Sequence, residues 1–191
     1  MNRHLLGYFA PIFSIGTFVV LWWLASFNVS ADFLPSPMAV VHEADRLLHT
    51  NLGGTDLWGH IFVSIRRVLI AFGLAVLFGL PLGLYMGWNR VFDKIVKPIF
   101  EVLRPIPPIA WIPIAILWLG VAEGSKVFIC FVGAFVIMVL NSYTGMRYVD
   151  PLLIDAAKSF GATRQQQFFN VAVPACMPSI FAGVQNALSM A

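Results

Sequence analysis

The chain has 191 residues, of which 59% are hydrophobic and only 11% are charged, and its formal net charge is +3. Soluble domains carry roughly 25% charged residues, so a water-soluble fold of this length would lack the polar side chains to cover its surface. The basic residues are spread over several loops, which excludes the concentrated basic face that nucleic-acid binding needs. We therefore expect an integral membrane protein, embedded in the lipid bilayer, that binds no nucleic acid.

Apolar runs predict five membrane spans, because a helix needs about 20 mostly apolar residues to cross the hydrocarbon core. Their expected limits are 8–27, 68–88, 106–121, 127–143 and 174–191. The first run is longer than the apolar core of a signal peptide, so we interpret it as an uncleaved span. The expected fold is all-α, a polytopic transmembrane helix bundle truncated within the fifth span, since the chain stops at Ala191 while still apolar.

The distribution of Lys and Arg predicts the orientation, because cytoplasmic loops are enriched in these residues. With the N-terminus in the cytoplasm, eight of the twelve basic residues fall inside and four outside. The segment 147–173 then faces the cytoplasm.

The first outer loop contains a helix signal. Ser36 can cap a helix that has Pro37 at its first position, and apolar residues follow at helical spacing. The spacings of His42, His49 and His60 fit no usual metal motif, so we expect neither a metal nor a cofactor.

Small residues recur every four positions in the second span and therefore share one helix face. They are Ala71, Ala75, Gly79, Gly83 and Gly87. Such a stripe lets another helix approach closely, which favours association in lipid, although bundle packing of this kind says nothing about what the partner does. Pro81 predicts a bend in this span.

Prolines interrupt the third span and prevent a regular helix as far as Pro108. They are Pro105, Pro107, Pro108 and Pro113. Two interpretations stay open. Broken backbone at membrane depth is typical of a transporter's solute pathway, whereas a structured loop at the membrane surface could hold the same residues.

The segment 150–174 predicts two short helices that meet at a glycine. Asp150 is a candidate N-cap, and Gly161 can adopt the left-handed conformation that ends a helix. Thr163 and Gln166 form a candidate capping box for the second helix. A cytoplasmic knob of this shape could insert into a groove on a soluble partner.

This segment resembles the cytoplasmic loop of the permease subunits of ATP-binding-cassette (ABC) importers. That loop has the pattern E-A-A, three residues, G, nine residues, I-x-L-P. This sequence keeps the same spacings, with Asp in place of Glu and Val in place of Ile and Leu. The matching residues are Asp155, Ala156, Ala157, Gly161, Val171, Val173 and Pro174.

Four further stretches look like the nitrate/sulfonate/taurine/bicarbonate branch of these permeases: 33–37, 81–87, 103–108 and 149–151. The resemblance implies a single type I permease domain over 1–191 that forms the pathway for a small anion or sulfonate-like solute. It also implies cytoplasmic ATPase subunits, an extracytoplasmic substrate-binding protein and a second permease, which is either an identical copy in a homodimer or a related chain. The segment 147–173 would then be the ATPase-coupling loop of a multi-pass protein of the bacterial inner membrane.

The sequence contains no GxxxxGK[ST] phosphate loop, so we expect no enzyme activity and ATP hydrolysis in a separate subunit. No ionisable residue lies in the middle of a span, which disfavours ion-coupled transport. Such permeases have five or six spans, whereas this sequence stops within the expected fifth span. A non-transporting scaffold or a degenerate permease fragment is therefore the alternative. A membrane enzyme is a third reading, which the lack of paired carboxylates or a nucleophile and base at membrane depth disfavours.

Overall fold

The computed structural model describes residues 3–30, 33–50, 54 and 56–191, with side chains from residue 11 onward. All regular structure in these ranges is helical. The contacts divide the chain into two compact units, residues 1–62 and 63–191, and each is described by itself.

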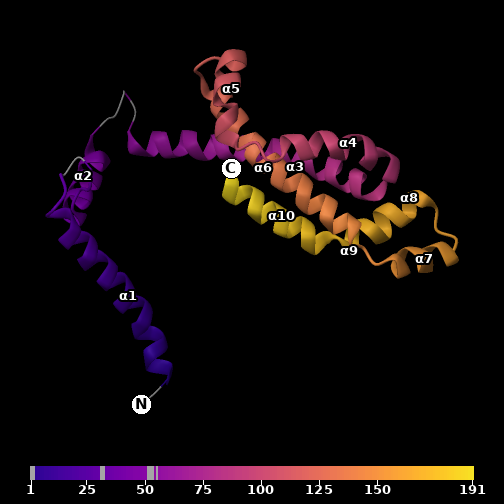
Figure 1. Ribbon diagram of the computed structural model, residues 1–191, viewed down its shortest axis with the longest axis horizontal. Coiled ribbons are helices and arrows are strands. Elements are labelled where there is room, and N and C mark those ends of the chain that lie inside the picture. Colours follow the sequence, from indigo (N-terminus) through magenta and orange to yellow (C-terminus); the bar gives the residue numbers. More distant parts are fainter. Residues whose placement is uncertain (1–2, 31–32, 51–53, 55) are drawn as a thin grey trace. The chain divides into compact units, whose positions relative to one another are not determined.

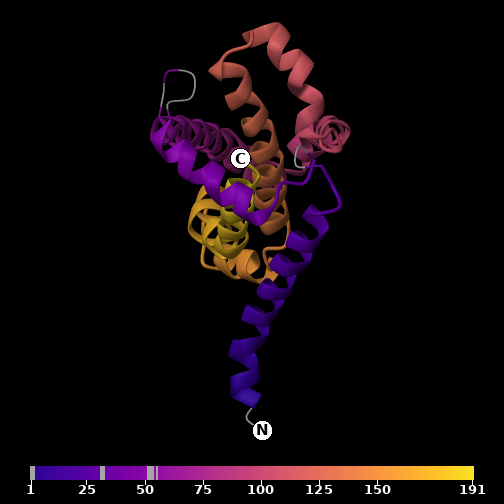
Figure 2. The same cartoon turned by 90° about the vertical axis from the view of Figure 1, so that its left-hand side faces the viewer.

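The first unit consists of an apolar helix and a shorter amphipathic one. The apolar helix is α1 (Arg3–Ser26), and the amphipathic helix is α2 (Pro37–His49), drawn in indigo and violet in Figures 1 and 2. The Ser36 side chain accepts a hydrogen bond from the Ala39 N–H at 3.2 Å, which confirms the predicted cap. The Trp22 indole donates to the Pro35 carbonyl at 3.1 Å and so ties α1 to the start of α2.

Two long apolar helices form the frame of the second unit. These are α3 (Leu57–Trp88), which begins in the first unit, and α6 (Glu123–Arg147). Among the described residues they are the two single helices long and apolar enough to cross a membrane. The helix α3 continues through Pro81 without interruption.

A helix that the sequence analysis did not assign follows α3. This is α4 (Arg90–Leu103), capped by the Asn89 side chain. Its charged residues lower its average hydropathy, so a search for long apolar runs passes over it. Beyond the prolines come a 3-10 turn, η1 (Pro108–Trp111), and α5 (Ile112–Leu119), and the chain bends by 88° between α4 and this pair. The helical part of the expected third span is therefore short, because proline lacks the N–H that a continuous helix needs.

The last third of the second unit is a chain of short helices. It comprises α7 (Pro151–Ser159), α8 (Arg164–Gln166), the π-helix η2 (Gln167–Ala172), α9 (Val173–Ala175) and α10 (Met177–Met190). The helix axis changes direction by 60° where α10 begins. The helix α10 therefore starts three residues after position 174, where the fifth span was expected to begin. Figure 1 shows α10 in yellow lying beside α6 in orange.

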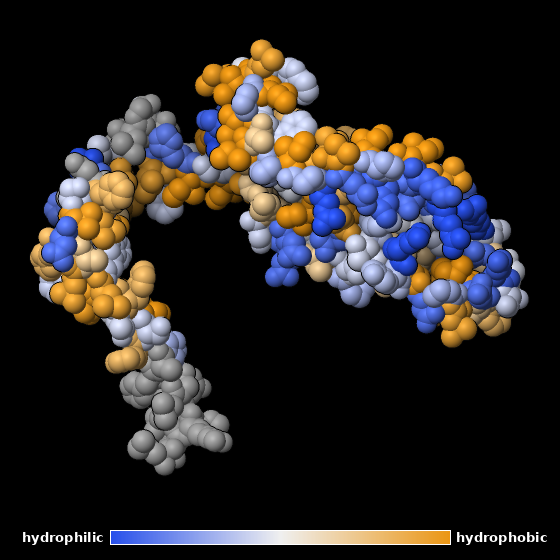
Figure 3. Space-filling view, in the orientation of Figure 1, coloured by the Kyte–Doolittle hydropathy of each residue, from blue (hydrophilic) through white to orange (hydrophobic). Residues whose placement is uncertain are grey.

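The buried core of the second unit is small for its length. One cluster joins α3, α6, η2 and α10 through residues such as Met138, Met146 and Ile180, and a second joins α3, α4 and α6 through Met86, Phe100 and Val139. Many large apolar side chains stay exposed outside these clusters. Figure 3 shows apolar surface over α5, and hydrophilic surface at the end where α4, α7 and α8 lie. This distribution is typical of a protein surrounded by lipid.

Candidate functional site

The helices α7 and α8 form a hairpin, residues 150–167, whose two helix starts are both capped by side chains. The Asp150 carboxylate accepts a hydrogen bond from the Leu152 N–H at 2.9 Å. At the second helix, the Gln166 side chain accepts from the Thr163 N–H at 2.8 Å, and the Thr163 hydroxyl accepts from the Gln166 N–H at 3.4 Å. These contacts confirm the predicted N-cap and capping box. Both caps depend on residues two or three positions apart, which is why the sequence revealed them.

Gly161 makes the turn between the two helices. Its φ is +81°, in the left-handed region that side chains with a Cβ rarely adopt. No described atom outside its own neighbourhood lies within 4 Å of the place where a Cβ would stand. The glycine is therefore required by backbone conformation and not by crowding, and the space around it is open.

A buried glutamine, which the sequence analysis missed, holds the turn in place. The Gln167 side chain is only 9% exposed, and its amide nitrogen donates to the Ala162 carbonyl at 2.7 Å. A bond across five residues follows no common capping pattern, so no local motif predicted it. The hairpin thus has a fixed shape even though it projects from the helix bundle.

The hairpin carries exposed apolar side chains at its tip and at the start of α7. Phe160 is 92% exposed, and Leu152 and Leu153 on α7 are 71% and 46% exposed. The predicted residues Asp155 and Ala156 are exposed on the same helix, whereas Ala157 is half-buried. Apolar groups gathered on a rigid projection favour a protein partner, because water solvates them poorly.

The other end of the predicted motif lies inside the bundle. Val171 and Val173 are half-buried in η2 and α9, and Pro174 is exposed in α9. Val173 packs with Phe168 and with Ile154 of α7 against the larger core cluster. The motif residues therefore lie on one continuous segment, which runs from the exposed hairpin to the start of α10.

The stripe of small residues on α3 lies against α6. Ala71 and Ala75 are fully buried, and Gly79 and Gly83 are buried as well. A Cβ on Gly83 would stand 2.5 Å from the Val139 carbonyl oxygen, and one on Gly87 would stand 2.6 Å from the Cβ of Met146. The two backbones therefore approach more closely than any larger side chain would allow.

Three of the four prolines of the third segment lie at the bend between α4 and η1, and Pro113 lies in the first turn of α5. Pro105, Pro107 and Pro113 are exposed, and Pro108 is half-buried, with its ring against Gly133 of α6. The indole N–H of Trp111, in the same turn, is buried without a hydrogen-bond partner among the described residues. An unpaired buried donor costs free energy unless a ligand or water satisfies it.

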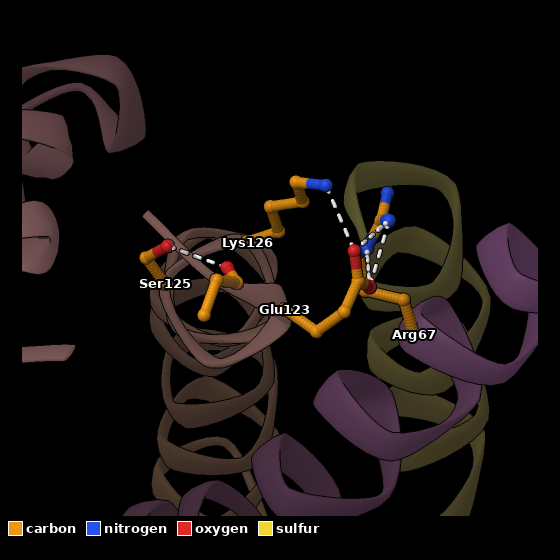
Figure 4. Close-up of polar contacts among 5 residues, drawn as sticks. Arg67, Glu123, Ser125 and Lys126 are labelled. Carbon is orange, nitrogen blue, oxygen red and sulfur yellow. Dashed lines mark hydrogen bonds and ion pairs between the residues drawn. The ribbon is translucent and has the colours of Figure 1, made fainter. Parts of the chain in front are cut away.

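An ionic cluster joins α3 to the first turn of α6. The Arg67 guanidinium forms a two-pronged ion pair with the Glu123 carboxylate, with contacts of 2.8 to 3.0 Å, and the Lys126 ammonium donates to the same carboxylate at 2.8 Å (Figure 4). Planar two-pronged pairs of this kind fix geometry as well as charge. Arg67 and Glu123 are 56 residues apart, so the sequence could not pair them. The carboxylate also lies in the first helical turn, where negative charge is favourable.

The segment from Gly79 to the C-terminal end of α10 matches a known family. The family model described as "Binding-protein-dependent transport system inner membrane component" matches residues 79–191, which include α6, the hairpin and α10. The chain belongs to this family. The permease is thus a membrane transport component and not a catalytic enzyme, and it is a multi-pass protein of the inner membrane.

Individual relatives extend the match over the whole length of this chain. A probable ABC transporter permease protein of Brucella melitensis biotype 1 is 39% identical over 191 residues, which is 100% of this chain and 76% of the relative. The taurine transport system permease protein of Escherichia coli K12 is 35% identical over 93% of this chain and 66% of its own length. The nitrate import permease protein of a Synechocystis species is 33% identical over 94% of this chain and 67% of its own length.

These findings confirm three predictions from the sequence. The permease belongs to the nitrate, sulfonate and taurine branch of ABC importer permeases, as the motifs indicated. Its architecture is the all-α membrane bundle of such a permease, and its role is that of the permease subunit of an importer.

Proposed function

We propose that the permease forms the import pathway for a small anion or sulfonate-like solute and is driven by a separate ATPase that docks on the hairpin at 150–167. The observation that carries the proposal is the exposed apolar tip on a turn of fixed shape. Phe160 is 92% exposed, and the neighbouring Gly161 makes the turn with a positive φ that other residues rarely adopt. A preorganised tip loses little conformational entropy when it enters a groove, which favours docking.

The base of the hairpin offers a route for force to reach the membrane helices. Phe168 packs edge-on against Trp88 at the end of α3, with ring centroids 5.4 Å apart. Ile154 and Val173 belong to the same cluster, which continues into α6 and α10. Because packed cores transmit displacement, movement of the docked hairpin would shift α3 and α10 together. This contact supports Asp155, Ala156, Ala157, Gly161, Val171, Val173 and Pro174 as parts of one coupling element.

The solute pathway is proposed at the broken segment that holds Pro105, Pro107, Pro108 and Pro113. Irregular backbone at membrane depth persists only where protein covers it or water reaches it. The unpaired indole N–H of Trp111 in this turn is a donor from which an anion can accept a hydrogen bond. The names of several relatives, which specify nitrate, taurine and aliphatic sulfonates, support an anionic solute class.

The remaining parts of the importer follow from this assignment. We place the N-terminus in the cytoplasm, since eight of the twelve basic residues then lie inside. A second permease copy, most simply an identical one, would complete the pathway, and an extracytoplasmic binding protein would deliver the solute. The stripe of small residues on α3 is covered by α6 of the same chain, so it supports helix packing within one copy.

The test is co-purification of the ATPase with Gly161→Arg, and Gly120→Arg is the matched control. Both glycines have positive φ, +81° and +73°, and no described atom crowds the site of a Cβ at either one. We expect Gly161→Arg to insert normally and to lose the ATPase, and Gly120→Arg to keep it. If both variants retain the ATPase, the hairpin is not the docking element. If the unmodified chain inserts well and recovers no ATPase at all, the scaffold alternative replaces the importer.

A further inference from the structure

A basic pocket lies where α4 begins and α6 ends. It is an open pocket of about 410 Å³, lined by Arg90, Lys94 and Arg147 together with Val91 and Asp93. Three cationic side chains and one carboxylate leave two positive charges in excess. The pocket therefore selects for an anionic ligand.

The carboxylate in this pocket is buried and incompletely paired. Asp93 is 8% exposed. The Tyr143 hydroxyl donates to one of its oxygens at 3.3 Å, and its other oxygen, Oδ1, is buried without a hydrogen-bond partner among the described residues. A buried charged acceptor left unpaired is costly, so the site calls for a ligand that brings a donor as well as a negative charge.

The position of the pocket points to the membrane surface. The two candidate spans α3 and α6 end at Trp88 and Arg147, and α4 begins two residues after Trp88. Figure 3 shows hydrophilic surface gathered at this end of the second unit. The pocket thus lies where the spanning helices leave the hydrocarbon core.

The helix α4 also offers an apolar surface next to the pocket. Val91, Ile95, Ile99 and Val102 follow one another at spacings of four, four and three, so they share one helix face, and they are 60 to 70% exposed. The opposite face packs on α3 and α6 through Phe92, Val96 and Phe100. Because water solvates exposed apolar side chains poorly, acyl chains of the surrounding lipid are the expected cover for this free face.

We propose that this pocket binds the headgroup of an anionic phospholipid of the phosphatidylglycerol class. Arg90, Lys94 and Arg147 would hold the phosphodiester. A glycerol hydroxyl would donate to Oδ1 of Asp93, and the acyl chains would lie along the free face of α4. Free phosphate would satisfy the cations but would make no contact with the adjacent apolar face, whereas a lipid contacts both, which favours the lipid.

The first test measures lipid binding to the full chain, purified in mild detergent with any partner that accompanies it, by native mass spectrometry. We expect phosphatidylglycerol to bind more tightly than phosphatidylcholine. The double variant R90Q/R147Q should weaken phosphatidylglycerol binding about 30-fold, since each basic residue near an anionic headgroup contributes about a factor of five. The double variant R46Q/R66Q removes the same two charges elsewhere and should bind as the unmodified chain does.

The second test isolates Asp93 and does not depend on the charge variants. Phosphatidylethanol carries the same phosphodiester but has no headgroup hydroxyl. The unmodified chain should bind phosphatidylglycerol several-fold more tightly than phosphatidylethanol. Asp93→Ala, which removes the acceptor, should abolish that difference while keeping affinity for both lipids.

Three results would overturn the proposal. The first is an equal loss of binding in R90Q/R147Q and R46Q/R66Q. The second is displacement of the lipid by millimolar glycerol phosphate, which would identify a site for a free phosphate. The third is exclusion of lipid from the assembled importer together with an ATPase cross-link to Lys94, which would identify the pocket as a protein interface.

Discussion

Gly83 occupies the closest approach between α3 and α6. A Cβ there would stand 2.5 Å from the Val139 carbonyl oxygen and 2.7 Å from the Cβ of Ser142, and both contacts are shorter than real Cβ atoms make. Gly73 lies on the same helix, and no described atom outside the helix lies within 4 Å of its Cβ position. Two identical residues ten positions apart therefore face opposite requirements, because one is in the interface and the other is on the free face.

Gly83→Ala should destabilise the second unit by roughly 1–3 kcal/mol, since an added methyl group in a packed interface forces the two backbones apart. Gly73→Ala is the matched control, and it should be neutral or stabilising by up to about 1 kcal/mol because alanine favours the helix. Denaturant titration of the purified chain in detergent measures both. Equal stability of the two variants would mean that α3 and α6 do not pack at this point.

At the scale of elements, two features depart from regular transmembrane helices. The chain bends by 88° between α4 and the segment that contains α5, and it bends by 60° ahead of α10. Proline accounts for both positions: Pro107 and Pro108 precede α5, and Pro174 and Pro178 flank the second bend. The start of α4 and the hairpin lie at the same end of the second unit (Figure 1). Breaks of this kind let a short element move without unfolding its neighbours.

Whether the first bend lines a watery pathway can be tested with an introduced cysteine. In a background with Cys130→Ala and Cys176→Ala, Pro107→Cys should react with a charged, membrane-impermeant thiol reagent about tenfold faster than Leu117→Cys, because the reactive thiolate forms only where water reaches the thiol. Leu117 is a suitable comparison because it is 81% exposed on the apolar helix α5, where lipid would surround it. Equally slow reaction at both positions would contradict the pathway assignment.

At the scale of the whole molecule, the chain exposes far more apolar surface than a soluble protein could. Side chains such as Leu117, Trp118 and Val121 are 68 to 88% exposed. Lipid or a second copy must cover this surface, because water would oppose its exposure. The basic residues then decide which ends of the spans face the cytoplasm.

The orientation predicts opposite accessibility for two exposed residues. In the same cysteine-free background, Thr50→Cys should be labelled by an impermeant reagent in intact spheroplasts, and Ser159→Cys should be labelled only in inside-out vesicles. Both side chains are exposed in the structure, so a difference in labelling reports the side of the membrane and not burial. Labelling of Ser159→Cys from outside would reverse the proposed topology and remove the hairpin from the ATPase.

Features that depend on near neighbours along the chain could be predicted from the sequence. Composition required a membrane, and the caps at Ser36, Asp150 and Thr163 followed from residues two or three positions away. The turn at Gly161 and the spacing of the permease motif were equally local. These predictions succeeded because a cap, a turn or an apolar run is decided by the chain within a few residues of itself.

The contacts between residues far apart in the chain emerged from the packing of whole helices. This packing placed α6 against the small stripe of α3, paired Arg67 with Glu123 across 56 residues, and set Tyr143 against Asp93 across 50. The structure also showed the helix α4. The charged residues of this segment lower its average hydropathy, but its apolar face is evident once the helix is formed. Such contacts depend on how whole helices pack, because the energy of a close approach belongs to two surfaces and not to either sequence alone.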